Sequence, residues 1–325
     1  METANTNTGE GTNTGERRPE GPWVSGIVPP ICTPFTPDLD VDVSSLERLI
    51  AFLIEEGVTG LFFLGSSGET AFLTDTQRDQ VVETAVKTVA GQVPVLAGVI
   101  DMTTSRMIDH AARAMSLGAD AIVATAPFYA QVTEAPEVDR HFRALKAACG
   151  APLLAYDIPV AVHTKLRASQ LLALAADHVI DGLKDSSGDL AGMREVIIGT
   201  RSQPKFAVFT GSELIVDCAM QVGASGSVPG LGNVDPKGFV ELYRSCRAGD
   251  WEKARLQQER LITLFDVTNC GKPGKGRNAS ALGGFKTALM LRGIIATNAM
   301  ALPQAALDDE ETAAVREVLV TTGLL

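Results

Sequence analysis

The sequence of 325 residues predicts an α/β fold: a (β/α)8 TIM barrel with a C-terminal helical extension. Short apolar runs alternate with segments of helical periodicity, which gives eight strand-then-helix units. The runs are apolar on both faces, as parallel strands covered by helices are, and eight such units close naturally into a barrel of about 250 residues. An open, doubly wound sheet is the alternative, but no GxGxxG motif opens the first helix.

The elements follow in order along the chain. Strands are expected at 26–35, 61–64, 93–100, 120–126, 152–157, 179–184, 206–210 and 225–229. Helices are expected at 44–56, 74–90, 105–117, 136–148, 168–176, 190–199, 214–223 and from about 236 onward. Ser44 or Ser45 is expected to cap the first helix. Three further helices, at 251–267, 279–295 and 308–319, make up the remainder, so we expect a disordered tail over 1–22, a barrel over 23–249 and a helical region over 250–325.

The amino-acid composition and net charge limit which kinds of partner this protein can bind. Hydrophobic residues make up 45% of the chain, enough for a sizeable core, and the formal net charge is -11. Nucleic acids and anionic membranes both require a basic face, so we expect neither as a partner, whereas a small anionic substrate needs only a few local donors. The five cysteines form no CxxC pair, and no apolar run or leader indicates a membrane span or signal peptide. We therefore expect reduced thiols and a cytoplasmic protein.

Lys184 is the first candidate for chemistry. It ends the apolar run 179–183 and precedes a Ser/Gly turn, so its stem packs among apolar residues and its amine reaches the mouth of a strand. Burial disfavours the charged form of an amine, and a neutral amine can attack a ketone to form a Schiff base. The competing interpretation is a strand-end lysine whose amine extends to solvent.

Active sites of such barrels lie at the carboxyl ends of the strands. The second strand ends in Gly65-Ser66-Ser67-Gly68-Glu69, where two hydroxyls and several backbone N–H groups can hold a carboxylate. A simple turn and helix cap is an equal alternative there. Ser212 follows the seventh strand. Tyr129 and Tyr156, two of only three tyrosines, stand at predicted strand mouths, and Tyr156 could supply the proton that a ketone attacked by Lys184 needs.

Other residues show weaker patterns. The four histidines (His110, His141, His163, His178) lack HxH or HExxH spacing, so we expect structural or surface roles and no metal site. A phosphate site after the eighth strand is disfavoured, because no lysine or arginine stands beside that glycine-rich loop. The basic, glycine-rich segment 270–278 is interpreted as a solvated connector rather than a ligand loop.

Six motifs then occur together in one order. They are Thr33-Pro34-Phe35, Gly65-Ser66-Ser67-Gly68-Glu69, Pro127-Phe128-Tyr129, Tyr156-Asp157-Ile158-Pro159, Gly182-Leu183-Lys184-Asp185-Ser186-Ser187-Gly188-Asp189 and Asn233-Val234. The chain, from about residue 25 to the C-terminal helices, resembles the N-acetylneuraminate lyase and dihydrodipicolinate synthase family of pyruvate-dependent class I aldolases.

The resemblance implies a role for each matching position. Lys184 would form the Schiff base with pyruvate or another 2-oxo acid, without a metal or separate cofactor. Ser66 and Ser67 would bind the substrate carboxylate beside Gly68, with Ser67 also in a proton relay. Tyr156 would be the principal acid/base. Tyr129 would reach the neighbouring subunit's site in a homodimer or homotetramer, and Val228 would contact pyruvate.

Two departures from the family pattern bear on the substrate. Asp157 replaces the usual asparagine, and Ala161 stands where synthases carry an arginine that receives the aldehyde's carboxylate. Alanine cannot provide that bidentate partner. The sequence therefore favours a 2-keto-3-deoxy sugar acid aldolase or dehydratase. A dihydrodipicolinate synthase, which condenses pyruvate with aspartate semialdehyde, and a non-catalytic 2-oxo acid binding protein are the alternatives.

Overall fold

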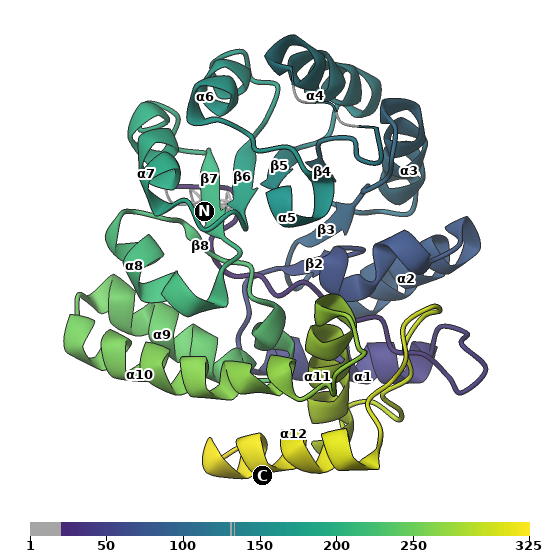
Figure 1. Ribbon diagram of the computed structural model, residues 1–325. Coiled ribbons are helices and arrows are strands. Elements are labelled where there is room, and N and C mark those ends of the chain that lie inside the picture. Colours follow the sequence, from purple (N-terminus) through teal and green to yellow (C-terminus); the bar gives the residue numbers. More distant parts are fainter. Residues whose placement is uncertain (1–20, 131, 133) are drawn as a thin grey trace, which may run out of the picture.

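Eight parallel strands form the wall of a barrel in the computed structural model, which describes residues 21–130, 132 and 134–325 (Figure 1). The strands are β1 (Gly26–Ile27), β2 (Leu61–Phe63), β3 (Val95–Gly98), β4 (Ala121–Thr125), β5 (Leu153–Asp157), β6 (Gly182–Asp185), β7 (Ala207–Thr210) and β8 (Gly226–Ser227). Each strand from β2 to β7 pairs with the next strand in the chain, and β1 pairs with β8. The predicted (β/α)8 TIM barrel with C-terminal helices is confirmed. Most of the tail expected over 1–22, residues 1–20, lies outside the described residues.

The seam between β1 and β2 is closed just beyond β1. There the Ile31 N–H donates to the Phe62 carbonyl at 2.8 Å, and the Phe62 N–H donates to the Pro29 carbonyl at 3.0 Å. Prolines 29 and 30 supply no N–H, so a regular ladder cannot continue and β1 is much shorter than the predicted 26–35. The Asn233 side chain, after β8, holds the same segment in place, because its Nδ2 donates to the Pro30 carbonyl and its Oδ1 accepts from the Cys32 N–H.

Helices surround the strands, as Figure 1 shows. They are α1 (Val43–Glu55), α2 (Asp75–Val89), α3 (Thr104–Ser116), α4 (Ala135–Cys149), α5 (Pro159–Val162), α6 (Ala168–Ala176), α7 (Leu190–Gly199), α8 (Val216–Gln221), α9 (Pro236–Ala248), α10 (Trp251–Leu264), α11 (Arg277–Leu291) and α12 (Asp309–Thr321). The sequence did not predict α5, a single turn after β5. The expected cap of α1 is wrong: Asp42 caps it, because its Oδ1 accepts from the Ser45 N–H at 3.0 Å and its longer reach spans the first turn.

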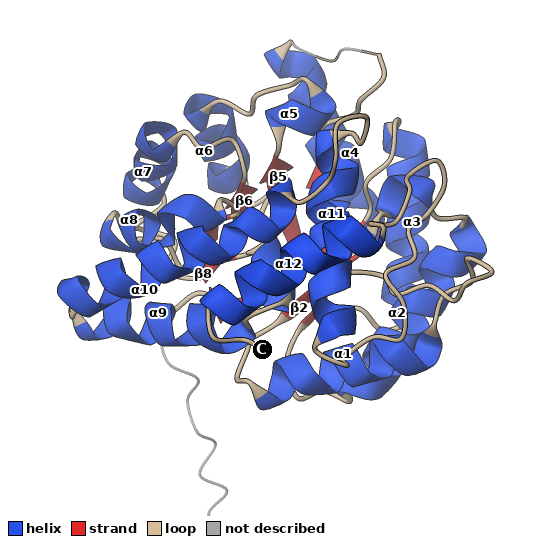
Figure 2. Cartoon of the chain, turned by 60° about the horizontal axis from the view of Figure 1, so that its bottom comes forward, coloured by secondary structure: helices blue, strands red, loops and turns tan. Residues whose placement is uncertain are grey.

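The last three helices come forward in Figure 2 and lie against the barrel and one another. Gln258 of α10 joins this layer to the loop after β7. Its Oε1 accepts from the Val216 N–H at 2.9 Å, and its Nε2 donates to the Glu213 carbonyl at 2.8 Å. The C-terminal region is thus bonded directly to the loops at the ends of the strands.

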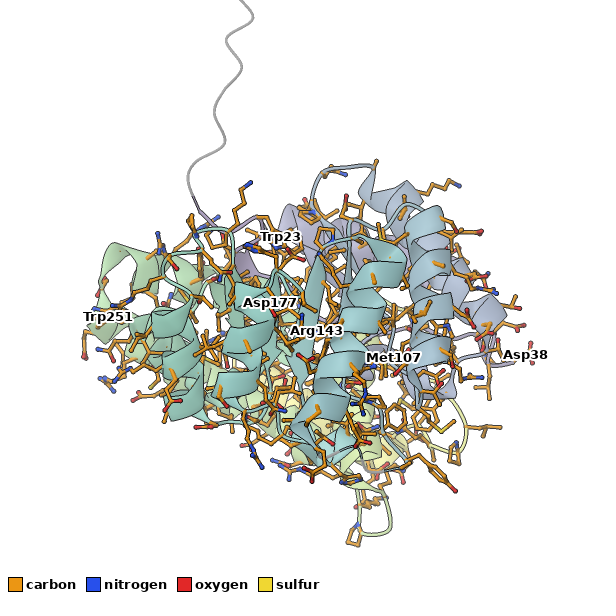
Figure 3. All side chains as sticks on the ribbon, turned by 90° about the horizontal axis from the view of Figure 1, so that it is seen from above. Trp23, Asp38, Met107, Arg143, Asp177 and Trp251 are labelled. Atoms are coloured by element: carbon orange, nitrogen blue, oxygen red, sulfur yellow. The ribbon has the colours of Figure 1, made fainter. Side chains whose placement is uncertain are left out.

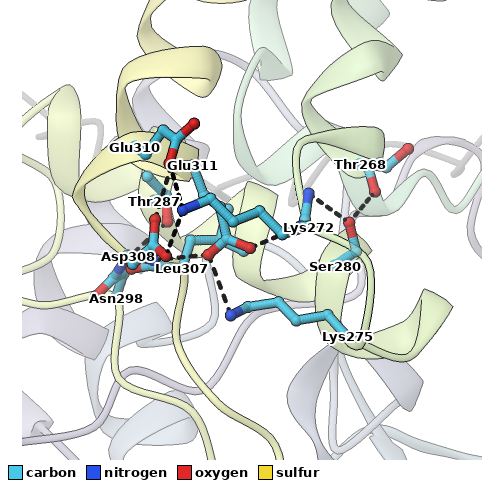
Figure 4. A network of polar contacts seen from close by, with 11 residues as sticks. Thr268, Lys272, Lys275, Ser280, Thr287, Asn298, Leu307, Asp308, Glu310 and Glu311 are labelled. Carbon is cyan, nitrogen blue, oxygen red and sulfur yellow. Dashed lines mark hydrogen bonds and ion pairs between the residues drawn. The ribbon is translucent and has the colours of Figure 1, made fainter.

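The basic segment 270–278 connects α10 to α11 through a polar network with the start of α12 (Figure 4). The Lys272 ammonium lies 2.9 Å from the Asp308 carboxylate and 2.6 Å from that of Glu310, and Lys275 lies 3.1 Å from Glu311. Glu311 also accepts the Lys272 N–H at 2.7 Å. These lysines pair with acidic groups of the chain itself, so the segment acts as a connector whose ion pairs hold the start of α12.

Charged side chains cover the outer helices, as Figure 3 shows. Arg143 of α4 and Asp177, just after α6, form one of the ion pairs there at 2.6 Å. Within the described residues, no helix has both the length and the apolar character to cross a membrane. The five cysteines are free thiols, of which Cys32 and Cys246 are buried.

Candidate active site

Lys184 lies inside the barrel, next to Tyr156 of the neighbouring strand. The two residues are register partners in β6 and β5, so their side chains share the interior face. The Lys184 side chain is buried, and its Nζ lies 4.0 Å from the Tyr156 ring centroid and 4.8 Å from that of Phe62. The two rings meet edge to face at 6.3 Å. The amine therefore does not extend to solvent, which rules out the competing interpretation of this lysine.

Gly211 provides the room that this lysine occupies. A Cβ at position 211 would lie 2.0 Å from Ser186 Oγ and 3.1 Å from Lys184 Cε. The first distance is far below van der Waals contact and the second is tight, so any side chain here would displace both residues. The absence of a side chain at Gly211, after β7, is thus required for the observed position of the Lys184 amine.

The serine pair forms a 3-10 turn, η1 (Ser66–Gly68), directly after β2. Leu64 and Glu69, on either side of it, both have left-handed backbone, with φ of 56° and 57°. That conformation costs a residue other than glycine about 1 kcal/mol, and such strain concentrates at functional sites. Neither serine hydroxyl bonds to another described side chain or backbone group, so both are available to a ligand.

Two contacts fix the shape of this turn. The Thr33 hydroxyl, from the first matching motif, donates to the Gly68 carbonyl at 2.8 Å. Gly98 at the end of β3 lies against Leu64, where a Cβ would be 2.1 Å from the Leu64 carbonyl oxygen. The strained loop is therefore held from the segment after β1 and from β3, so its donors have a fixed arrangement that could accept an anion.

Glu213 is a site residue that the sequence reasoning missed, although it directly follows the predicted Ser212. Its Oε1 accepts from the Gly230 N–H at 2.8 Å and from the Leu231 N–H at 3.3 Å, which joins the ends of β7 and β8. Burial raises the pKa of this carboxyl, and the charge of nearby Lys184 acts in the opposite direction. The sequence did indicate it, because Glu213 stands at the predicted end of the seventh strand, next to the candidate Ser212.

The end of β5 explains the unusual Asp157. Its neighbour Tyr156 faces the barrel interior, so Asp157 faces outward, where it is fully buried and forms an ion pair with Lys165. Asp157 also accepts the Leu166 N–H at 3.1 Å. Burial raises the pKa of Asp157, and the bond from Lys165 opposes that rise. Lys165 is thus engaged outside the barrel, while Ala161 of α5 is exposed and carries no charge.

The remaining predicted residues are placed as follows. Val228 is buried directly after β8, and its N–H donates to the Thr210 carbonyl at 2.8 Å. Ser212 is half-buried at the mouth of β7. Tyr129 is 90% exposed, with a φ of 78°, so this chain does not bring its ring to its own Lys184. The site within one chain therefore comprises Lys184, Tyr156, Phe62, Glu213 and the serine turn.

The histidines lie elsewhere. His110 and His141 are buried and bonded within the protein, and His163 and His178 are exposed. Among the described residues, no three His, Cys, Asp or Glu side chains gather as metal ligands would. A cavity of about 980 Å³ lies at the opposite end of the strands, where Pro94 and Asp120 precede β3 and β4, and none of the predicted site residues lines it.

Comparison with known proteins identifies the family. A model of the Dihydrodipicolinate synthetase family matches residues 23–322. The chain belongs to this family. The prediction made from the six motifs is thereby confirmed. Because other members are named as synthases or aldolases, the findings support a lyase of class I aldolase type.

Named relatives of this dihydrodipicolinate synthetase family protein differ in function. It is 35% identical to an uncharacterized DapA-like lyase of Halobacterium salinarum, over 92% of this chain and 94% of the relative. It is 32% identical to the 4-hydroxy-tetrahydrodipicolinate synthase of Methanosphaerula palustris, over 91% and 98%. It is 33% identical to the Probable 2-dehydro-3-deoxy-D-pentonate aldolase YjhH of Escherichia coli, over 74% and 80%.

Solved structures agree on the fold. YagE of Escherichia coli, a prophage protein of the dihydrodipicolinic acid synthase family solved in complex with pyruvate, superposes with a TM-score of 0.86 at 28% identity. The match covers 93% of this chain and 99% of YagE.

Proposed function

We propose that this protein is a class I aldolase that forms a Schiff base between Lys184 and pyruvate or a related 2-oxo acid, and that it cleaves or dehydrates 2-keto-3-deoxy sugar acids. The observation that carries the proposal is the buried amine of Lys184, placed against the rings of Tyr156 and Phe62 at the carboxyl end of β6. The iminium formed between the Lys184 amine and the substrate ketone accepts the electron pair, so the proposed reaction needs neither a metal nor a separate cofactor.

The chemistry follows from the groups around the amine. The neutral Lys184 amine attacks the ketone carbon, and loss of water from the carbinolamine leaves a cationic iminium. The faces of Tyr156 and Phe62 stabilise that cation. The iminium accepts the electron pair of the breaking C3–C4 bond, which gives an enamine and releases an aldehyde. Tyr156 donates and accepts the protons of these steps, with Ser67 in its relay, and hydrolysis of the product iminium returns Lys184.

The substrate carboxylate is expected to bind at the serine turn. The free hydroxyls of Ser66 and Ser67 and the backbone around Gly68 offer donors at the mouth of β2. Val228 follows β8 and Ser212 follows β7, at the same end of the barrel.

Two features favour a sugar acid as the remainder of the substrate. The exposed α5 carries Ala161 and no cation, and Lys165 is engaged by Asp157, so a second carboxylate would find no partner there. Glu213 places a carboxylate near Lys184, and carboxylates accept hydrogen bonds from hydroxyl groups such as those of a deoxy sugar acid. The 32% identity to a 4-hydroxy-tetrahydrodipicolinate synthase favours synthase activity as the second candidate.

The proposed assembly is a homodimer or homotetramer in the cytoplasm. Tyr129 stands 90% exposed at the end of β4 in a left-handed conformation, which suits a side chain that completes a neighbouring subunit's site.

The first experiment traps the intermediate. Borohydride reduction with pyruvate should attach one pyruvate-derived group to Lys184, as mapped by peptide mass spectrometry. Lys184→Ala should abolish the adduct, whereas Lys205→Ala, which removes an exposed lysine, should retain it. An adduct elsewhere, or one that survives Lys184→Ala, would refute the Schiff base.

The second experiment addresses the substrate. A panel of 2-keto-3-deoxy acids is assayed for pyruvate release and for dehydration, beside condensation of pyruvate with aspartate semialdehyde. Faster condensation would identify a synthase instead. Tight pyruvate binding without exchange of its methyl protons would indicate a binding protein.

A further inference from the structure

An ion pair is buried next to the serine turn and is not used by the chemistry above. Glu69 and Lys286 contact each other through side chains that are both fully buried. Glu69 also accepts the Ala301 N–H through Oε2 at 2.8 Å. Lys286, on α11, donates to the Ala299 carbonyl at 2.7 Å, and its Nζ lies 4.1 Å from the centroid of the Phe35 ring. Each charge is thus satisfied from the C-terminal region and from the first matching motif.

Glu69 is also part of the backbone of the turn. Its N–H donates to the Ser66 carbonyl at 3.1 Å and so closes the 3-10 turn that carries both serines. Its left-handed φ of 57° is unfavourable for glutamate, and the surrounding contacts must hold it there. The conformation of the carboxylate receptor therefore depends on where the Glu69 side chain is anchored.

The charge of Glu69 matters as well as its shape. A buried carboxylate directly after an anion-binding turn repels a substrate carboxylate, because the interaction of two charges is strong where water is excluded. Lys286 supplies the compensating charge. The other titratable group beside the pair is Cys32, whose burial raises its pKa to about 12, so this thiol stays neutral. Burial lowers the pKa of Lys286, and the charge of Glu69 acts in the opposite direction.

We propose that Lys286 is a positioning residue for 2-oxo acid binding: it neutralises Glu69 and, through it, holds the Ser66–Gly68 turn in a shape and charge state that accept the substrate carboxylate. The inference rests on the proposed function and assigns a role in the active site to a helix outside the barrel. It predicts that loss of Lys286 weakens pyruvate binding whereas loss of the Glu69 charge does not, a difference that a purely structural ion pair would not show.

The test measures the pyruvate concentration that gives half-maximal adduct formation on Lys184, together with the limiting rate. Lys286→Met leaves Glu69 uncompensated and should raise that concentration about tenfold or more, with a much smaller change in limiting rate. Glu69→Gln keeps an acceptor for the Ala301 N–H and removes the negative charge beside the turn, so pyruvate should bind no more weakly than in wild type. The double variant Lys286→Met/Glu69→Gln removes both charges and should recover most of the affinity.

Acetone, a ketone without a carboxylate, serves as the matched probe. Trapping of acetone on Lys184 should respond little to Lys286→Met, because the affected interaction is with the carboxylate. Equal losses with pyruvate and acetone, or weaker pyruvate binding in Glu69→Gln, would overturn the inference. If Lys286→Met does not fold by circular dichroism, Glu69→Gln and the double variant decide the question by the same two probes. Absence of an adduct in wild type would instead refute the proposed function.

Discussion

His141 should make the protein sensitive to mild acid. Its Nε2 donates to the Thr125 carbonyl at 3.0 Å, and its Nδ1 faces the Thr104 hydroxyl at 2.9 Å. Burial of the ring lowers its pKa from 6.5 to about 4. Between pH 6.5 and about 4, His141 is therefore protonated in the unfolded chain but neutral in the native protein. The contribution of neutral His141 to the free energy of unfolding is fully present above pH 6.5 and decreases as the pH falls toward 4. The decrease is about 2 kcal/mol at pH 5 and ~3 kcal/mol in total.

The assay compares free energies of unfolding in urea for wild type and His141→Gln at pH 7.5 and at pH 5. Other groups titrate equally in both proteins, so the difference between them isolates the histidine. The advantage of wild type over the variant should shrink by about 2 kcal/mol between the two pH values. Thr104→Val keeps the histidine while removing one partner, and it should keep the wild-type pH dependence. Parallel pH profiles for wild type and His141→Gln would show the reasoning to be wrong.

Two further predictions concern the ends of β5 and β7. Lys165→Met should destabilise the protein by about 2–3 kcal/mol, because it leaves the buried Asp157 carboxylate unpaired, and Lys165→Met/Asp157→Asn should recover most of that loss in urea unfolding. An unchanged midpoint in Lys165→Met would contradict this account. Gly211→Ala should slow adduct formation on Lys184 about tenfold or more while the protein stays folded, since the new methyl group displaces Ser186 and Lys184. Gly276→Ala, where a Cβ meets nothing within 4 Å, is the control, and equal rates for both alanine variants would exclude steric displacement.

The sequence predicted the fold because each barrel unit repeats a local signal. Apolar runs bounded by turn residues mark the strands, and most of the expected helices lie within a few residues of the observed ones. The errors come from tertiary context. β1 is short because the Pro29 and Pro30 backbones lack donors, and Asp42 captures the cap expected of Ser45 because its side chain reaches the Ser45 N–H.

The site could be predicted only in part, for a similar reason. Lys184 and Tyr156 were found because each stands at a strand end, and parallel strand ends meet in space. Glu213 shares that position and could have been found. Lys286 could not, because it lies in a helix beyond the barrel and nothing local in the sequence connects it with Glu69. Contacts between residues this far apart in the chain depend on how α11 packs, which periodicity alone does not reveal.

The C-terminal helices bond to two loops at the carboxyl ends of the barrel strands, one after β2 and one after β7. On the β2 side, Lys286 of α11 anchors Glu69 and hence the turn of Ser66 and Ser67. On the β7 side, Gln258 of α10 donates to the carbonyl of Glu213, whose carboxylate in turn accepts from the loop after β8. Contacts within the barrel, from Thr33 and Gly98, hold part of the strained turn after β2. Bonds from the outer helical layer add to those contacts, so helices after residue 249 shape the candidate site together with the strands.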